Sequence, residues 1–586
     1  MDQVTRDNMQ MKHNKIAQPP HVAGTNQANR PPLTAESNTD AAIAISPEMR
    51  RDATGTNARE ATAIATEEGA LAANAASLTA AQGLAPDAQG LAPNAENVNP
   101  NAGAMAATTG ASAPVVGNQN SAAPEILPSF ANDILRTFKL FWPLFLGQLA
   151  STGMSVADTV MAGAAGTIEL SGVAIGVSLY VPAVLFVLGL SMGVQPIVAH
   201  LRGAGRENEI AVKMHSATII CLIVSVLVGI IMCFLPLLYH LMPNIDKEMV
   251  RVGQGYLIAV AAGMPAIAMY NILHGYWEGL GITMPTLLFG LFSLILNVPL
   301  NWIFIFGHFG APALGGIGCG VATSITIYLT IIFMFIYVKT SKHFVHCRLY
   351  VRWYSVPFSE VKQFLAFAFP LALSTTIEAT CFSIVALLLS PFGPATVAGH
   401  TIALNVMGVI FMIPLSIASA TTIRVGAAMG AMNWERSRRI VQGAYTLGFS
   451  FYVIYFTTIL LGHDFIVGLY SDDLEVMPIA SYLLMLCIIF LLPDSMQVIS
   501  IGILRGFKDS RTILIITILC YWLIGLPVGY VLAYGIVIQE PMSASGFWIG
   551  FICALSCACL IYLSRIFYIF KTHHLPKTFA ISSSII

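Results

Sequence analysis

The sequence predicts an all-α polytopic membrane protein, with twelve transmembrane helices in two pseudo-twofold-related six-helix lobes and a disordered N-terminal tail. Three observations lead to this fold class. The 586 residues are 56% apolar and only 10% charged, whereas an average soluble protein is about 25% charged. Long apolar runs follow one another from about residue 138 onward. The second half of the chain also repeats the first at a nearly constant spacing.

The first 125 residues differ in composition from the rest of the chain. They contain no Phe, Trp or Tyr, and they include a local duplication, QGLAPDA followed by QGLAPNA (Gln82–Ala95). Such a stretch cannot bury enough apolar surface to offset the entropy lost on ordering. It also lacks the charged segment and short apolar core of a signal peptide. We therefore predict that residues 1–125 form a disordered cytoplasmic tail.

The apolar runs have the length of membrane-spanning helices. Crossing about 30 Å of hydrocarbon takes about 20 helical residues. Continuous apolar runs exclude a closed β-barrel, whose strands alternate in polarity over about 10 residues. We predict helices near residues 138–162, 174–200, 212–241, 253–276, 284–307, 316–338, 363–389, 399–423, 439–462, 477–503, 512–535 and 545–570.

The distribution of Lys and Arg predicts the orientation. With twelve spans, most basic loop residues fall on one side, which the positive-inside rule makes the cytoplasmic side. Both termini are then expected to be cytoplasmic. The opposite side carries Lys247 and Arg251 but is otherwise richer in acidic residues. The residues on the basic side are Arg202, Arg206, Lys213, Lys339, Lys342, Arg348, Arg352, Lys362, Arg424, Arg436, Arg438, Arg439, Arg505, Lys508, Arg511, Lys571 and Lys577.

An internal repeat relates the two halves at an offset of about 227 residues. FWPLFLG (Phe141–Gly147) aligns with AFPLALS (Ala368–Ser374), so that Pro143 corresponds to Pro370. Six spans are an even number, so the two halves start on the same side and form a parallel repeat. We expect one lobe over residues 135–340 and another over 360–572. Two facing lobes of this kind are the architecture of an alternating-access carrier.

Few carboxylates lie within the apolar runs, and each is a candidate site residue. Asp158, Glu378 and Asp494 lie inside predicted spans, and Glu278 lies at the end of the fourth. Ionisable residues at membrane depth commonly mark ion or proton pathways, although each can equally be a structural polar residue paired with a neighbour. An unpaired buried carboxylate binds a proton or a cation.

Asp494 has the most suggestive surroundings. Pro493 leaves a backbone carbonyl without its helical donor, and Gln497 follows about one turn later. A carboxylate and a free carbonyl are oxygen ligands that suit a hard cation such as Na⁺. Asn297, Asn301 and Asn405 add amides that either line a cavity or hold helices together.

Signatures of enzymes are missing or lie in an unsuitable context. GLSMG (Gly189–Gly193) matches the pattern of a nucleophile elbow but falls in a membrane span. The sequence contains neither G-K-[ST] nor H-E-x-x-H. We expect no catalysis, no cofactor and no nucleic-acid partner, and we expect transport to draw on an ion gradient.

Several motifs together resemble the NorM-type branch of the multidrug and toxin extrusion (MATE) family. The resemblance covers roughly residues 135–572, in order and in both lobes. The motifs are DTVMAG (Asp158–Gly163), GAGR (Gly203–Arg206), EGLG (Glu278–Gly281), LNVPLNWIFIFGHFGAPALGGIGCGVAT (Leu296–Thr323), VAGHTIALN (Val397–Asn405), TIRVGAAMG (Thr422–Gly430), DSMQV (Asp494–Val498) and GILRGFKDSRTI (Gly502–Ile513).

This resemblance implies a monomeric antiporter of the bacterial inner membrane that exports organic cations and related drugs in exchange for Na⁺ or H⁺. It assigns cation coupling to Asp158, Glu278 and Asp494, with Na⁺ at Glu278 and Asp494. Relatives carry a Tyr where this chain has Phe490, which keeps a π face but lacks the hydroxyl. Two alternatives remain open, a lipid-linked oligosaccharide flippase and an ion channel. The candidate supporting residues are Glu378, Gln497, Phe490, Asn405 and Asn297.

Overall fold

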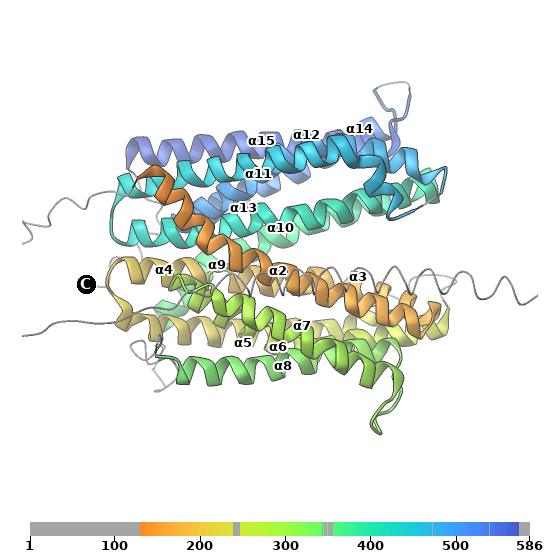
Figure 1. Ribbon diagram of the computed structural model, residues 1–586, viewed down its shortest axis with the longest axis horizontal. Coiled ribbons are helices and arrows are strands. Elements are labelled where there is room, and N and C mark those ends of the chain that lie inside the picture. Colours follow the sequence, from red (N-terminus) through yellow and green to blue (C-terminus); the bar gives the residue numbers. More distant parts are fainter. Residues whose placement is uncertain are drawn as a thin grey trace, which may run out of the picture. The chain divides into compact units, whose positions relative to one another are not determined.

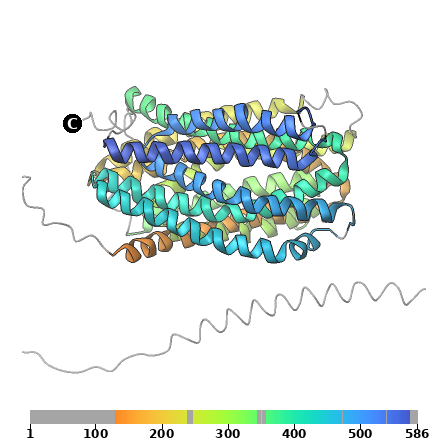
Figure 2. The same cartoon turned by 90° about the horizontal axis from the view of Figure 1, so that it is seen from above.

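The computed structural model describes residues 129–237, 246–342, 344, 349, 356–471, 473–537 and 540–573, all within one compact unit that spans residues 118–586. The predicted tail, residues 1–125, lies outside the described residues. Regular structure in the described ranges is entirely helical. In the two views at right angles, the helices run along one common direction (Figure 1 and Figure 2).

Six spans make up the first half of the bundle. The second span is interrupted at Met192 and Gly193, two turn residues that separate its two helices. The elements are α2 (Phe130–Ala165), α3 (Thr167–Ser191) with α4 (Val194–Gly203), the short η2 (Glu207–Glu209), α5 (Ile210–Phe234), α6 (Lys247–Gly279), α7 (Met284–Phe306) and α8 (Gly316–Thr340).

Six further spans make up the second half. The eleventh span is not a uniform α-helix, because its middle third is a π-helix, η6 (Ile518–Gly525). The other elements are α9 (Phe358–Leu388), the short η5 (Ser390–Phe392), α10 (Pro394–Gly430), α11 (Trp434–Gly468), α12 (Val476–Gly506), α13 (Ser510–Thr517), α14 (Leu526–Ala533) and α15 (Ser543–Thr572).

The prediction of an all-α membrane protein with twelve helices is confirmed. Each predicted range falls on one observed span. The last residues of the third predicted range, 238–241, lie outside the described ranges. Eleven of the spans are long and apolar enough to cross a membrane by length and composition. The twelfth, α2, is 36 residues long. Its hydropathy is reduced by polar residues such as Gln148, Thr152 and Asp158.

The first helix of each half packs partly on the other half. The start of α2 contributes Phe141 and Leu144 to the apolar core formed mainly by α9–α15. The start of α9 contributes Phe364 and Ala368 to the core formed mainly by α3–α8. Figure 1 shows α2 running obliquely from α11 toward α7, and it contacts both helices.

Contacts between the halves concentrate near one end of the bundle, which we name the basic end. It is the end at which α2 begins, α4 ends and α10 ends, and its loops and helix ends carry most of the Lys and Arg residues that follow residue 125. Here α4 and α10 approach at backbone distance: a Cβ on Gly203 would lie 1.9 Å from the carbonyl oxygen of Ala427, and one on Gly430 would lie 2.1 Å from that of His200. Only glycine allows this approach.

Candidate functional site

Glu378 on α9 is half-buried and is the centre of a polar cluster in the second half, whose other members, Tyr521 and Gln497, are buried. The hydroxyl of Tyr521 lies 2.6 Å from Glu378 Oε1 and donates a hydrogen bond to it. Gln497 Nε2 on α12 in turn lies 3.0 Å from the Tyr521 oxygen and donates to it. A carboxylate, a phenol and an amide from three spans thus form one hydrogen-bonded chain.

Asp494 lies beside this chain, one turn before Gln497 on α12. Its side chain is buried, with 4% of the residue exposed, and its Oδ2 has no hydrogen-bond partner in the described structure. Glu378 is the acidic side chain that lies near enough to interact with it electrostatically. The structure therefore brings together three of the predicted residues, Glu378, Asp494 and Gln497.

The position of Tyr521 follows from the π-helix. A π-helix widens the turn and shifts the side chains that follow in register, and such segments are frequent at functional sites. Pro527, at the start of α14, has no N–H to continue a regular α-helical ladder. Tyr521 is not among the predicted site residues because it lies in an unbroken apolar run, in which the nearby Pro527 is the available signal.

Phe490 lies on α12 one turn before Asp494 and is fully buried. Its ring packs against Trp548 with 5.6 Å between ring centroids. Trp548 Nε1 donates a hydrogen bond to Nδ1 of His400 at 3.2 Å. Phe490 thus packs against the ring of Trp548. At this position the family resemblance implies a Tyr, whose hydroxyl Phe490 lacks.

Asp158 belongs to a separate cluster in the first half. Its Oδ1 accepts a hydrogen bond from Asn301 Nδ2 at 2.6 Å, and its Oδ2 accepts one from Thr323 Oγ1 at 2.9 Å. Asn301 also donates to Asn297 Oδ1 at 2.9 Å. The predicted residues Asp158 and Asn297 therefore lie in one network that links α2, α7 and α8.

Glu278 forms a third network, near the basic end. Its Oε2 accepts a hydrogen bond from Gln195 Nε2 at 2.7 Å, and its Oε1 accepts one from Thr286 Oγ1 at 2.9 Å. Gln195 also donates to the Ser419 hydroxyl of α10 at 2.7 Å, which connects this network to the other half. Gln195 had a recognisable signal, since it is a polar residue inside the second predicted span.

Glu278 and Asp494 have different neighbours, since Glu278 contacts Gln195 and Thr286 whereas Asp494 lies beside Glu378. In the described ranges no hydrogen bond joins them, and no group of three or more His, Cys, Asp or Glu side chains could hold a metal ion. Asn405 on α10 is exposed and belongs to none of the three networks. A bound Na⁺ would need hydroxyl, amide or carbonyl oxygens in addition to a carboxylate.

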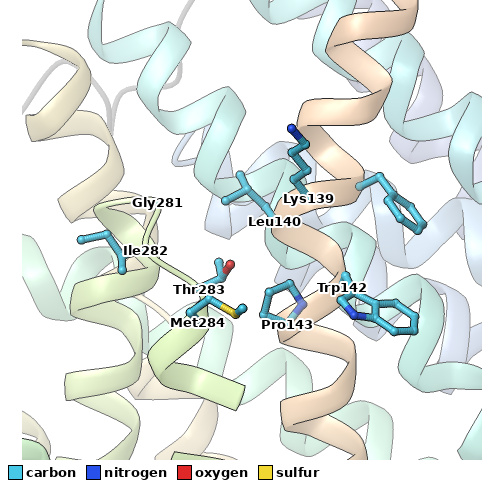
Figure 3. Close-up of a pocket in the computed structure, with 9 residues that line it drawn as sticks. Lys139, Leu140, Trp142, Pro143, Gly281, Ile282, Thr283 and Met284 are labelled. Carbon is cyan, nitrogen blue, oxygen red and sulfur yellow. The ribbon is translucent and has the colours of Figure 1, made fainter. Parts of the chain in front are cut away.

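A pocket of about 640 Å³ lies at the basic end, beside the segment that joins Glu278 to Thr286 of the third network. One wall is the start of α2, from Phe138 to Pro143, and the other is the segment from Gly281 to Met284 that joins α6 to α7. Figure 3 shows Pro143 opposite Thr283 and Met284. The pocket contains no predicted site residue.

Comparison with known proteins identifies the family. A family model described as MatE matches the chain twice, over residues 143–303 and 370–531. The two matches begin at Pro143 and Pro370, in agreement with the repeat found in the sequence. Together they cover more than half of the chain.

Curated relatives match along most of their length. The chain is 38% identical over 428 residues to the probable multidrug resistance protein NorM of Idiomarina loihiensis, covering 73% of this chain and 92% of the relative. It is 35% identical over 434 residues to the multidrug resistance protein NorM of Vibrio cholerae, covering 74% and 95%.

Solved structures share the fold at lower identity. A eukaryotic MATE transporter superposes with a TM-score of 0.68 at 20% identity, covering 76% of this chain and 97% of its own. A multidrug resistance MATE transporter of the MOP superfamily in an outward-facing conformation gives 0.65 at 21%, covering 78% and 97%. The chain therefore belongs to the MATE family of multidrug and toxin extrusion transporters, in its NorM-type branch of multidrug efflux proteins.

Proposed function

We propose that this transporter is an antiporter that exports organic cations and related drugs in exchange for Na⁺ or H⁺. The observation that carries the proposal is a pair of neighbouring carboxylates, the half-buried Glu378, which accepts a hydrogen bond from Tyr521, and the buried Asp494. Neither forms an ion pair with Lys or Arg in the described part of the chain. Two neighbouring carboxylates at membrane depth repel each other and are poorly solvated. Binding a proton or a metal cation stabilises them.

Coupling then follows from a difference in affinity between two conformations. A cation that neutralises Glu378 and Asp494 stabilises one arrangement of the lobes, and a cationic drug stabilises the other. Na⁺ and H⁺ both suit the oxygen set of carboxylate, phenol and amide. Asp158 has its own hydrogen-bond network in the first lobe and is the second residue that binds a cation or a proton in this proposal.

The basic end is the cytoplasmic end in this proposal. Trp434 at the start of α11 lies 4.8 Å from His573 at the end of α15, measured between ring centroids, so these basic segments meet at one end. The positive-inside rule places that end in the cytoplasm. Because the lobes contact each other there, the described conformation is closed toward the cytoplasm.

Counter-transport in proteoliposomes tests the proposal. Purified protein would be reconstituted with a fluorescent organic cation, and Na⁺ and pH gradients would be imposed separately. We expect one of the two gradients to drive uphill movement of the cation. Ion flow without drug exchange would indicate a channel and contradict antiport.

The substitution Asp494→Asn tests the site. It preserves shape and removes the charge, so we expect drug efflux to be abolished while membrane insertion is unchanged. Efflux from intact cells and the amount of protein in the membrane fraction would be measured together. Wild-type efflux by this variant would show that Asp494 is not a coupling residue.

A further inference from the structure

Two ion pairs cross between the lobes at the basic end. The first joins Asp133 in the first turn of α2 to Arg424 in the last turns of α10. Arg424 Nη2 lies 2.6 Å from Asp133 Oδ1, and Nη1 donates to the Asp133 carbonyl oxygen at 2.6 Å and to Thr137 Oγ1 at 2.5 Å. The Arg424 side chain is 8% exposed and that of Asp133 is not exposed.

The second ion pair joins Glu360 in the first turn of α9 to Lys213 in the first turn of α5. The side chains are 16% exposed for Lys213 and 8% exposed for Glu360. Lys213 Nζ also lies 3.4 Å from Gln363 Oε1. This pair likewise connects one lobe to the other.

The two acidic residues occupy equivalent positions in the internal repeat. Glu360 lies 227 residues after Asp133, which is the offset that relates Pro143 to Pro370. Each carboxylate therefore sits at the start of the first helix of its own lobe and reaches a cation of the other lobe. The cations themselves lie on non-equivalent helices, α10 and α5.

We propose that Asp133–Arg424 and Glu360–Lys213 form a pseudo-symmetric clamp that closes the basic end and has to open in every transport cycle. This inference rests on the proposed function, because alternating access requires the lobes to separate at this end. The contacts behind the clamp also belong to both lobes. Phe141 on α2 lies 5.3 Å from Phe451 on α11, measured between ring centroids.

Burial explains why the clamp favours the closed state and is still reversible. Removing one partner of a buried pair leaves a charge in a poorly solvated place, which is strongly unfavourable. When the lobes separate as intact bodies, water reaches both partners together, and neither charge is left buried. The Arg424 guanidinium is suited to the tighter half of the clamp because its fixed fork serves three acceptors.

Hydrogen exchange measured by mass spectrometry on the full-length protein in nanodiscs tests the clamp. It needs neither a drug nor an ion gradient, so its result does not depend on the assigned coupling ion. For Arg424→Gln we expect exchange at the start of α2 to rise on the order of 100-fold, with a similar rise at the end of α4. Arg439→Gln is the matched control, since Arg439 pairs with Glu435 inside α11.

Charge reversal at the second pair separates a clamp from a folding defect. Glu360→Lys alone places two lysines together, and we expect faster exchange at the starts of α9 and α5 and a loss of efflux on the order of tenfold. Combining Glu360→Lys with Lys213→Glu restores an opposite-charge pair and is expected to restore protection. Rescue would exclude a general defect in folding.

Two results would overturn the proposal. One is unchanged exchange at the basic end in Arg424→Gln and in Glu360→Lys. The other is faster exchange spread equally over both ends of the bundle, with no recovery in the reversed pair. If the clamp variants behaved as expected but neither gradient drove drug export, the proposed antiport would be wrong and the clamp assignment would stand.

Discussion

Tyr521 shows how a single neutral donor organises the candidate coupling site. Its hydroxyl connects Glu378 to Gln497, so it links α9 to α12 through the π-helix of the eleventh span. A hydrogen bond to a charged group contributes about 1.5–3 kcal/mol. Loss of this hydroxyl should therefore alter the ion affinity of Glu378 without removing its charge.

Tyr521→Phe is expected to reduce efflux on the order of tenfold while Glu378→Gln abolishes it. The ring is retained, so packing around it should change little. Efflux rates would be measured against the external Na⁺ concentration and pH, and the variant should shift the ion dependence. Tyr530→Phe is the control, because Tyr530 lies in the same span and is 41% exposed. An unchanged ion dependence in Tyr521→Phe would contradict its role.

Lys508, in the loop between the tenth and eleventh spans, makes stability depend on pH. Burial, reinforced by the charges of Lys213 and Arg206, lowers the pKa of Lys508 to about 7. In the unfolded chain the pKa is about 10.4. The folded protein binds this proton less tightly, so this residue's contribution to stability falls as the pH decreases from about 10 to about 7.

Replacing Lys508 with Met should remove this dependence. We expect the Tm of Lys508→Met to exceed that of the wild type at pH 7 and the difference to shrink toward pH 10. Lys571→Met at an exposed position of the same end serves as the control. Equal pH profiles for Lys508→Met and the wild type would show that Lys508 carries its full charge in the folded protein.

At the scale of elements, the close approach of α4 and α10 lets the two lobes meet at the basic end. Gly203 and Gly430 allow backbone carbonyls to approach where a Cβ would overlap them. Backbone atoms cannot move aside as flexible side chains can. The helices would then have to separate.

Gly203→Ala is expected to hold the basic end apart and to abolish efflux, with a stability cost of about 1–3 kcal/mol from overpacking. Gly462→Ala, at a helical position of α11 with no atom within 4 Å of the new Cβ, should be neutral or slightly stabilising. Efflux and Tm would be measured for both. Normal efflux by Gly203→Ala would mean that α4 and α10 do not have to meet as closely in the cycle.

Element boundaries show what could be read from the sequence. The twelve apolar runs located every span, because membrane insertion requires about 20 apolar residues in a row. They did not reveal the π-helix, since a change in helical register leaves hydropathy unaltered. They also placed the start of the first span near residue 138, whereas α2 begins at Phe130. Asp133 therefore lay outside the predicted helix.

At the scale of the whole molecule, the shared part of the chain begins well after the N-terminus. The family model first matches at residue 143, and the compact unit begins at Asn118. Every site discussed above lies within that unit.

Deleting residues 2–117 is expected to leave drug efflux per molecule unchanged. Efflux and the amount of protein in the membrane would be compared with those of the full-length chain, with Asp494→Asn as the inactive reference. A loss of efflux at equal protein level would assign the N-terminal segment a role in transport.

The sequence by itself determined the helical membrane fold, the repeat of two lobes and the acidic residues placed inside apolar spans. Hydropathy and helix length are local properties, so they can be read residue by residue. Only the tertiary structure decided the partners of those residues: Asp494 lies beside Glu378 and not beside Glu278, and Asp133 pairs with Arg424, 291 residues away. Such partners depend on how helices pack across lobes, and composition and spacing along the chain do not contain that information.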